Sequence, residues 1–206
     1  SYKYMFPFTD KNYQPQENES MEAKAEGSNA TAAELAYDWL VDNNGKNFLY
    51  MPITNYSDFS LSASEKLLGE KMAIMGLGDG GAHVGFLSDA SAFTYMLTHW
   101  SRDRSRGAQL PLEWAVKRLS RDNAEAIGLM DRGLLQVGKK ADINVIDFDE
   151  LGINPPEVLY DLPAGGKRMV QKTRGYEATI VAGEVVYRNG VETGALPGRL
   201  VRGAQA

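Results

Sequence analysis

The chain of 206 residues contains no cysteine and only two histidines, His83 and His99. The absence of cysteine excludes disulfide bonds, thiolate metal ligands and a cysteine nucleophile, and it is compatible with a cytoplasmic protein. The shortage of histidine limits metal sites, because a catalytic zinc ion needs about three protein ligands. Any catalytic chemistry of this chain therefore depends mainly on carboxylates.

The sequence also lacks an excess of positive charge and a long apolar run. Its 22 basic and 27 acidic residues are interspersed and give a net charge of −5, so we expect neither nucleic acid nor a membrane surface as a partner. The densest basic run, residues 102–106 (RDRSR), is predicted to be a solvated loop rather than a phosphate site. No apolar run approaches membrane-spanning length, and no secretory pattern opens the chain.

Several common catalytic motifs are missing. The sequence has no G-x-S-x-G elbow, no phosphate-binding loop and no H-E-x-x-H metal motif. Residues 76–81 (GLGDGG) resemble a dinucleotide-binding loop only loosely, because the third glycine of the fingerprint falls at the wrong spacing. These absences argue against a serine hydrolase with a nucleophile elbow, a phosphate-loop nucleotide-binding protein, an H-E-x-x-H metalloprotease and a dinucleotide-binding protein.

The first part of the chain alternates apolar runs with helical patterns. The runs 47–54 and 72–77 predict buried strands. Helices are predicted after the capping box Thr31–Glu34, over 61–69, from Ser88 or Asp89 to Trp100, and from Pro111 to Gly128. Apolar strands that alternate with helices are typical of a parallel sheet covered by helices, so we predict an α/β fold.

Beyond residue 132 the pattern changes to short strands. Residues 141–145, 176–181 and 184–188 predict strands, with tight turns at Ala182-Gly183 and Asn189-Gly190. The segment 152–168, rich in glycine and proline, is predicted to be a loop. We therefore predict two domains, an α/β part over 1–131 and a small β domain over 132–206.

The stretch MAIMGLGDGGAHVG (72–85) carries the strongest chemical signal. Its apolar run leads to Asp79, and ligand sites of parallel α/β sheets lie at the carboxyl ends of the strands. Asp79 in that place could bind a divalent cation or take a proton from water, with Gly80 and Gly81 leaving room for a ligand. The alternative is that Asp79 only forms a turn. His83 could bind metal or substrate, or only satisfy a buried loop.

His99 is different, because it lies off the apolar stripe of its predicted helix. We therefore predict a partly exposed structural histidine rather than a ligand.

Several stretches occur in an order that is typical of one family. They are FPFTD (6–10), NYSD (55–58), GDGGAH (78–83), LLQVGKKADINVID (134–147), GEVV (183–186) and TGALPGRLVR (193–202). Together they resemble the amidohydrolase superfamily, and more closely its D-aminoacylase branch, the N-acyl-D-amino-acid deacylases.

The resemblance implies a (β/α)₈ TIM barrel with one or two divalent metal ions, usually zinc, beside a small β-sandwich domain. Asp79 matches the aspartate after the last barrel strand, which in this family contacts the metal and shuttles a proton from the attacking water to the leaving amine. Gly80, Gly81 and His83 would lie near the substrate. The implied reaction is hydrolysis of a linear amide of the N-acyl-D-amino acid type.

The departures from the family pattern are equally informative. No His-x-His motif occurs, and a complete barrel needs about 250 residues. The aromatic start Ser1–Phe8 is unlike a frayed terminus. We therefore expect the C-terminal part of a longer enzyme, inactive and without a complete metal site by itself. It would associate with itself or with the missing N-terminal barrel part.

Two alternatives stay open at this point. One is a hydrolase of cyclic amides, similar to hydantoinases or dihydroorotases. The other is a non-catalytic fragment that serves only folding or assembly.

Overall fold

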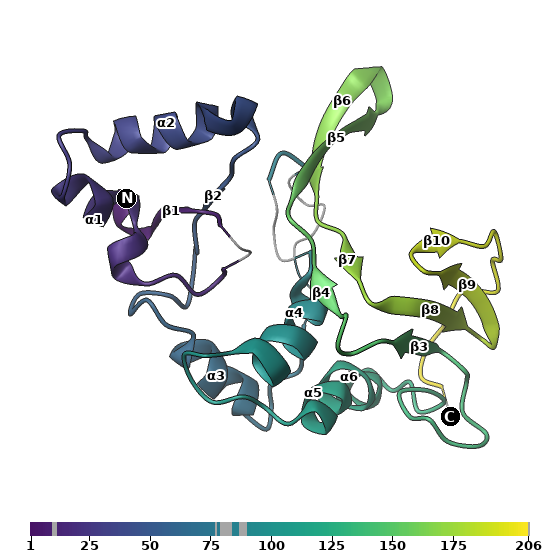
Figure 1. Ribbon diagram of the computed structural model, residues 1–206. Helices are drawn as coiled ribbons and strands as arrows, with labels where there is room; N and C mark the ends of the chain where they lie inside the picture. Colours follow the sequence, from purple (N-terminus) through teal and green to yellow (C-terminus); the bar gives the residue numbers. More distant parts are fainter. Residues whose placement is uncertain (10–11, 77, 79–83, 87–89, 206) are drawn as a thin grey trace. The chain divides into compact units, whose positions relative to one another are not determined.

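The computed structural model describes residues 1–9, 12–76, 78, 84–86 and 90–205 (Figure 1). The chain divides into two units, residues 1–73 and 74–206. Every strand pair in the described residues is antiparallel, and these residues close no barrel. The predicted parallel sheet is therefore wrong for the described part of the chain, which is a mixed α/β structure with several small sheets.

The first unit is mainly helical. Its elements are the 3₁₀ turns η1 (Tyr2–Tyr4) and η2 (Glu17–Glu19), the strands β1 (Phe6–Pro7) and β2 (Leu49–Tyr50), and the helices α1 (Met21–Glu26), α2 (Ala32–Gly45) and α3 (Ser62–Gly69). The helix predicted over 61–69 is confirmed by α3. The run 47–54, predicted as a buried strand, supplies only the two residues of β2, which pair with β1.

An aromatic cluster forms the core of this unit. Phe6, Tyr56 and Phe59 are buried, and Tyr4 stacks on Phe59 with the ring centroids 5.1 Å apart. The buried hydroxyl of Tyr56 donates a hydrogen bond to the carbonyl oxygen of Pro15 at 2.7 Å. Aromatic side chains combine a large apolar area with defined ring geometry, so this cluster holds short segments together where extended strands are lacking.

Helix α2 begins and ends where the sequence predicts. The Thr31 hydroxyl accepts from the backbone N–H of Glu34, and the Glu34 carboxylate accepts from the backbone N–H of Thr31. These two bonds satisfy N–H groups that a helix start leaves unpaired. Asn43 and Asn44 adopt positive φ angles of 50° and 57° and end the helix.

The second unit starts with helices. They are α4 (Ala92–Thr98), the π-helix η3 (His99–Asp103), α5 (Leu112–Leu119) and α6 (Arg121–Ala126). Met96, Leu97 and Trp100 are buried, which confirms most of the predicted apolar stripe, although Phe93 is exposed. The helix predicted from Pro111 to Gly128 is divided into α5 and α6 at Ser120, whose φ and ψ of −120° and −79° are not helical.

A four-stranded antiparallel sheet follows. Its strands β3 (Ile143–Ile146), β8 (Tyr176–Val181), β9 (Glu184–Arg188) and β10 (Val191–Glu192) lie in the order β10-β9-β8-β3. Both predicted hairpin turns are confirmed. Ala182 and Gly183 have φ angles of 50° and 86°, and Asn189 and Gly190 have angles of 49° and 77°, the positive values that a two-residue turn requires. The predicted division into domains at residues 131 and 132 stays a prediction, although strands replace helices near that point.

A hairpin arm separates β3 from β8. It consists of β4 (Gly152–Ile153), β5 (Glu157–Leu162), the turn η4 (Pro163–Gly165), β6 (Gly166–Val170) and β7 (Thr173–Arg174), with β4 paired to β7 and β5 to β6. Figure 1 shows these pairs as one continuous arm that leaves the sheet. The loop predicted over 152–168 is therefore wrong. Glycine and proline are confined to the ends of these strands, where they do not interrupt the ladder.

Close backbone contact fixes the base of the arm. Gly175 has a φ of +86°, and a Cβ atom there would lie 2.5 Å from the Leu151 Cα. Only glycine fits both the left-handed conformation and this approach. The turn at 147–151 and the start of β8 are therefore held together by the shape of the backbone.

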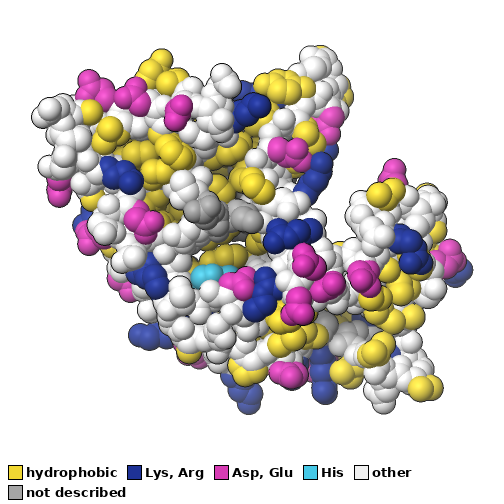
Figure 2. All heavy atoms as spheres, viewed as in Figure 1, with side chains coloured by type: hydrophobic (Ala, Val, Ile, Leu, Met, Phe, Trp, Pro, Cys, Tyr) yellow, Lys and Arg dark blue, Asp and Glu magenta, His cyan; other side chains and the backbone are white. Residues whose placement is uncertain are grey.

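Many apolar side chains of the chain are exposed. Ile53 is 81% exposed and Leu196 is 94% exposed. Figure 2 shows hydrophobic side chains spread over the face in view, between charged ones. In the part of the chain that the structure describes, no helix has the length and apolar character needed to cross a membrane.

Candidate active site

The residues that the sequence marks for chemistry, Asp79, Gly80, Gly81 and His83, lie outside the described residues. The structure therefore leaves their predicted roles as predictions. The structure describes the chain on both sides of them. On the N-terminal side it describes the residues up to Gly76, and Gly78, and on the C-terminal side the description resumes at Val84. The site can be approached through the contacts of these two flanks.

The flank before Asp79 is not a strand. Residues 73–76 have no regular secondary structure, and Ile74 is about half exposed, so the buried strand predicted over 72–77 is wrong for residues 72–76. The described contact of this flank comes from helix α6, where the side-chain amide Nδ2 of Asn123 donates to the Met75 carbonyl oxygen at 2.9 Å. A side chain here supplies the hydrogen bond that a neighbouring strand would otherwise give.

The flank after His83 contacts the hairpin arm. The backbone N–H of Met169, in β6, donates to the carbonyl oxygen of Val84 at 2.8 Å. The arm therefore reaches the chain one residue beyond His83. The predicted loop over 152–168 gave no reason to expect this, because only the strand pairing of β5 and β6 brings Met169 to this place.

Two polar side-chain contacts join helix α4 and its N-cap residue to the arm and to β8. The Ser91 hydroxyl donates to the Gln171 amide oxygen at 2.6 Å, and the hydroxyls of Thr94 and Tyr176 lie 2.9 Å apart. Both contacts are partly buried, where a lost hydrogen bond is costly. They attach the start of α4 to the arm between β6 and β7, and α4 itself to β8.

Among the described residues, no group of three or more His, Asp or Glu side chains is arranged to hold a metal ion. This part of the chain therefore does not supply a complete metal site.

His99 is a partly buried structural residue, as predicted. Its ring stacks on Tyr95 with the centroids 4.5 Å apart and meets the Trp100 ring edge-on at 5.8 Å. Burial lowers the pKa of His99 to about 4; the positive charge of Arg104 acts in the same direction, and Asp103 opposes them. The imidazole is therefore neutral at pH 7 and serves as an aromatic packing group.

We expect His99 to make the fold sensitive to acid. Its folded pKa of about 4 lies below the unfolded value near 6.5, so between these pH values the unfolded chain binds a proton that the folded chain does not. Stability falls as the pH drops through this window, by an amount on the order of 1–2 kcal/mol because water screens the partly exposed ring. Urea unfolding measures the free energy of unfolding at pH 7 and at pH 4.5. The decrease between these pH values should be smaller in His99→Gln than in the unchanged protein. An equal loss in both proteins would contradict this assignment.

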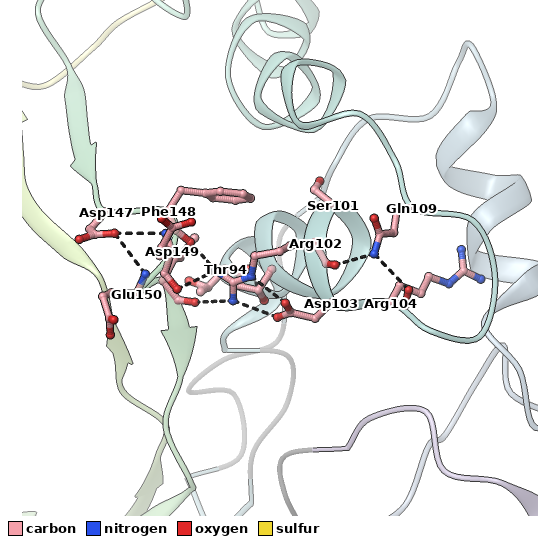
Figure 3. Close-up of polar contacts among 12 residues, drawn as sticks. Thr94, Ser101, Arg102, Asp103, Arg104, Gln109, Asp147, Phe148, Asp149 and Glu150 are labelled. Carbon is pink, nitrogen blue, oxygen red and sulfur yellow. Dashed lines mark hydrogen bonds and ion pairs between the residues drawn. The ribbon is translucent and has the colours of Figure 1, made fainter.

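Arg102 joins the π-helix to the turn that precedes the arm. Its guanidinium donates to the carbonyl oxygens of Phe148, Asp149 (3.3 Å) and Leu151 (2.8 Å). It also forms an ion pair with Asp103 at 2.7 Å, and the hydrogen bond and charge of Asp103 raise the pKa of Arg102. Figure 3 shows the side chain reaching from the helix to the backbone at Phe148 and Asp149.

Arg104 is less exposed than Arg102, with only 4% of its surface accessible. Its guanidinium lies 4.4 Å from the centroid of the Trp100 ring and donates to the carbonyl oxygen of Ala108 at 2.8 Å. The prediction that residues 102–106 form a solvated loop is therefore wrong for these two arginines. Guanidinium groups can be buried when carbonyls and an aromatic face satisfy them, a condition that sequence spacing does not reveal.

Comparison with known proteins adds the family. The family model described as the amidohydrolase family matches residues 30–187, which is more than half of the chain. The chain belongs to the amidohydrolase family. The matched residues include Asp79 and the run 134–147, whereas the ending at 193–202 lies beyond them. Comparison with curated proteins and with solved structures gave no match.

Membership supports a hydrolase of the amidohydrolase superfamily, whose members are in general metal-dependent. The ending at 193–202, which favours the D-aminoacylase branch, was not matched, so the branch rests on the resemblance alone.

Proposed function

We propose that this amidohydrolase chain is the C-terminal part of an enzyme that hydrolyses the linear amide of N-acyl-D-amino acids. The observation that carries the proposal is the family match over residues 30–187, which contains Asp79 in the motif GDGGAH. The D-aminoacylase resemblance of the ending TGALPGRLVR supports this substrate class over the cyclic amides of hydantoinase-like enzymes.

Asp79 is the proposed acid–base residue. Its carboxylate takes a proton from water as the water oxygen bonds to the acyl carbon. It then gives the proton to the amide nitrogen as the C–N bond breaks, so that an amine leaves and a carboxylic acid remains. A single carboxylate that serves first as base and then as acid conserves the proton, and general acid–base catalysis of this kind contributes about 10²–10⁴ to the rate.

Gly80, Gly81 and His83 are proposed to line the substrate side of Asp79. Glycines there would let the backbone approach the substrate closely. The imidazole of His83 can donate to or accept from a polar group of the substrate. The family's divalent metal, usually zinc, would be held mainly by ligands outside the described residues, because these contain no group of three candidate ligands.

The chain is proposed to act together with further barrel structure. The proposal extends the family resemblance, which implies a closed (β/α)₈ barrel, whereas the described residues close none. The further structure would be the N-terminal barrel segment or a second copy of the chain. A chain that serves only folding or assembly is the alternative.

The experiment compares this chain with the product of the complete reading frame. We expect the complete protein to release amine from N-acyl-D-amino acids and to lose that activity on chelation of its metal. The 206-residue chain alone should be inactive. Hydantoin and dihydroorotate serve as control substrates. Faster hydrolysis of either control substrate would favour the cyclic-amide alternative, and no hydrolysis of any substrate by the complete protein would contradict the proposal.

A further inference from the structure

Asn123 lies in helix α6 and connects that helix to the chain ahead of Asp79. Its Nδ2 donates to the Met75 carbonyl oxygen at 2.9 Å, across 48 residues of sequence. Its Oδ1 is buried, and among the described residues it has no hydrogen-bond partner. A buried amide oxygen without a hydrogen-bond partner is costly to keep, so the place of Asn123 calls for an explanation beyond packing.

The helix that carries Asn123 is well fixed. The neighbouring Ala124 is buried, and its carbonyl oxygen accepts from the backbone N–H of Leu129 at 2.8 Å. Gly133 lies so close that a Cβ atom on it would approach the Ala124 Cβ to 2.9 Å. The Asn123 side chain therefore projects from a rigid support, which is what a positioning group needs.

The segment that receives the hydrogen bond has little regular structure of its own. Residues 73–76 form no strand, so no ladder holds the Met75 carbonyl. Met75 is four residues before Asp79, a span that the chain crosses with two glycines, Gly76 and Gly78. The hydrogen bond from Asn123 therefore supplies an anchor to Met75 that regular structure does not supply in residues 73–76.

We propose that Asn123 is a positioning residue of the active site, which holds the chain ahead of Asp79 through the Met75 carbonyl. The inference rests on the proposed function, because it assumes that Asp79 moves the proton. The hydrogen bond from Met169 to Val84 is the corresponding anchor on the other side of residues 79–83. The two anchors come from α6 and the hairpin arm, which lie in the same unit.

The test uses the complete protein with Asn123→Ala, and with Glu125→Gln as the matched control. Glu125 is on the same helix, but it is exposed, and its carboxylate forms an ion pair with the Arg121 guanidinium at 2.6 Å. We expect Asn123→Ala to lower kcat by about 10- to 100-fold and to leave KM within about twofold, because misplacement of a catalytic group slows the chemical step. Glu125→Gln should leave both constants unchanged. Hydrogen exchange of peptides covering 72–76 should be faster only in Asn123→Ala.

A second variant separates positioning from general destabilisation. In Asn123→Asp the introduced carboxylate cannot donate to the Met75 carbonyl, whereas the protonated acid can. We therefore expect the activity of Asn123→Asp, relative to that of the unchanged protein, to rise as the pH is lowered. Burial raises the pKa of such a carboxyl, which brings the rise toward neutral pH. A residue that only fills space would give a constant ratio.

The outcomes distinguish the inference from the proposed function. If Asp79→Asn abolishes activity but Asn123→Ala keeps kcat within twofold, the positioning role is wrong and the proposed function stands. Unchanged hydrogen exchange over 72–76 in Asn123→Ala would also overturn the inference, with or without an active enzyme. If Asp79→Asn keeps full activity, the proposed function itself fails.

Discussion

Asp79→Asn is expected to lower kcat of the complete protein by about 10²–10⁴, because the amide can neither take a proton from water nor pass one to the leaving nitrogen. KM should change much less, since the residue acts on the chemical step. The substitution keeps the size of the side chain, so the fold should persist. Steady-state kinetics with an N-acyl-D-amino acid give the result directly.

The control for this prediction is Asp38→Asn. Asp38 is an exposed carboxylate on helix α2, and its substitution removes the same charge from the chain. It should leave kcat unchanged. Metal content of both variants, measured on the purified proteins, separates loss of a ligand from loss of the proton-transfer group. Equal activity of Asp79→Asn and the unchanged protein would remove Asp79 from the mechanism.

Arg102→Ala is expected to lower the free energy of unfolding by about 2–4 kcal/mol, because hydrogen bonds from charged donors are worth about 1.5–3 kcal/mol each and the abandoned acceptors are partly buried. The Arg102 guanidinium donates hydrogen bonds to the carbonyl oxygens of Phe148 and Leu151, and Leu151 itself is fully buried. The loss would loosen the turn from which the hairpin arm starts. Urea unfolding followed by tryptophan fluorescence reports it, since Trp100 lies in the same π-helix.

Two further variants sharpen this measurement. Arg102→Lys keeps the charge but replaces the planar guanidinium and its five N–H donors with a compact ammonium that has three, so an intermediate loss of stability is expected. Arg121→Ala removes an exposed ion pair with Glu125 and should cost less than about 0.5 kcal/mol. If Arg102→Ala were no more destabilising than Arg121→Ala, the role assigned to the guanidinium would be wrong.

Features fixed by a few neighbouring residues could be predicted from the sequence. The capping box Thr31–Glu34 formed as expected because both hydrogen bonds lie within one helical turn. The turns at Ala182-Gly183 and Asn189-Gly190 formed because Gly183, Asn189 and Gly190 readily adopt the positive φ angles that place the flanking strands side by side. The family could also be recognised, because its motifs are runs of adjacent residues.

Features that depend on a distant partner could not be predicted. An apolar run such as 72–77 forms a strand only where another strand is available, and residues 72–76 have none. The arm over 152–174 exists because β5 pairs with β6 and β4 with β7, which the scattered glycines and prolines concealed. The same holds for the candidate site. Asp79 was predicted from its local motif, whereas the Asn123 anchor is evident only from its contact with Met75 in the folded chain.

By itself, the sequence determined the family, the local caps and turns and the carboxylate proposed for catalysis, because each depends on residues that are close together in the chain. The tertiary structure decided that Arg102 and Arg104 hold backbone carbonyls instead of facing water. It also decided that α6 and the arm hold the two flanks of residues 79–83. The physical reason is that a hydrogen bond between residues far apart in sequence depends on the fold, and no local pattern encodes it.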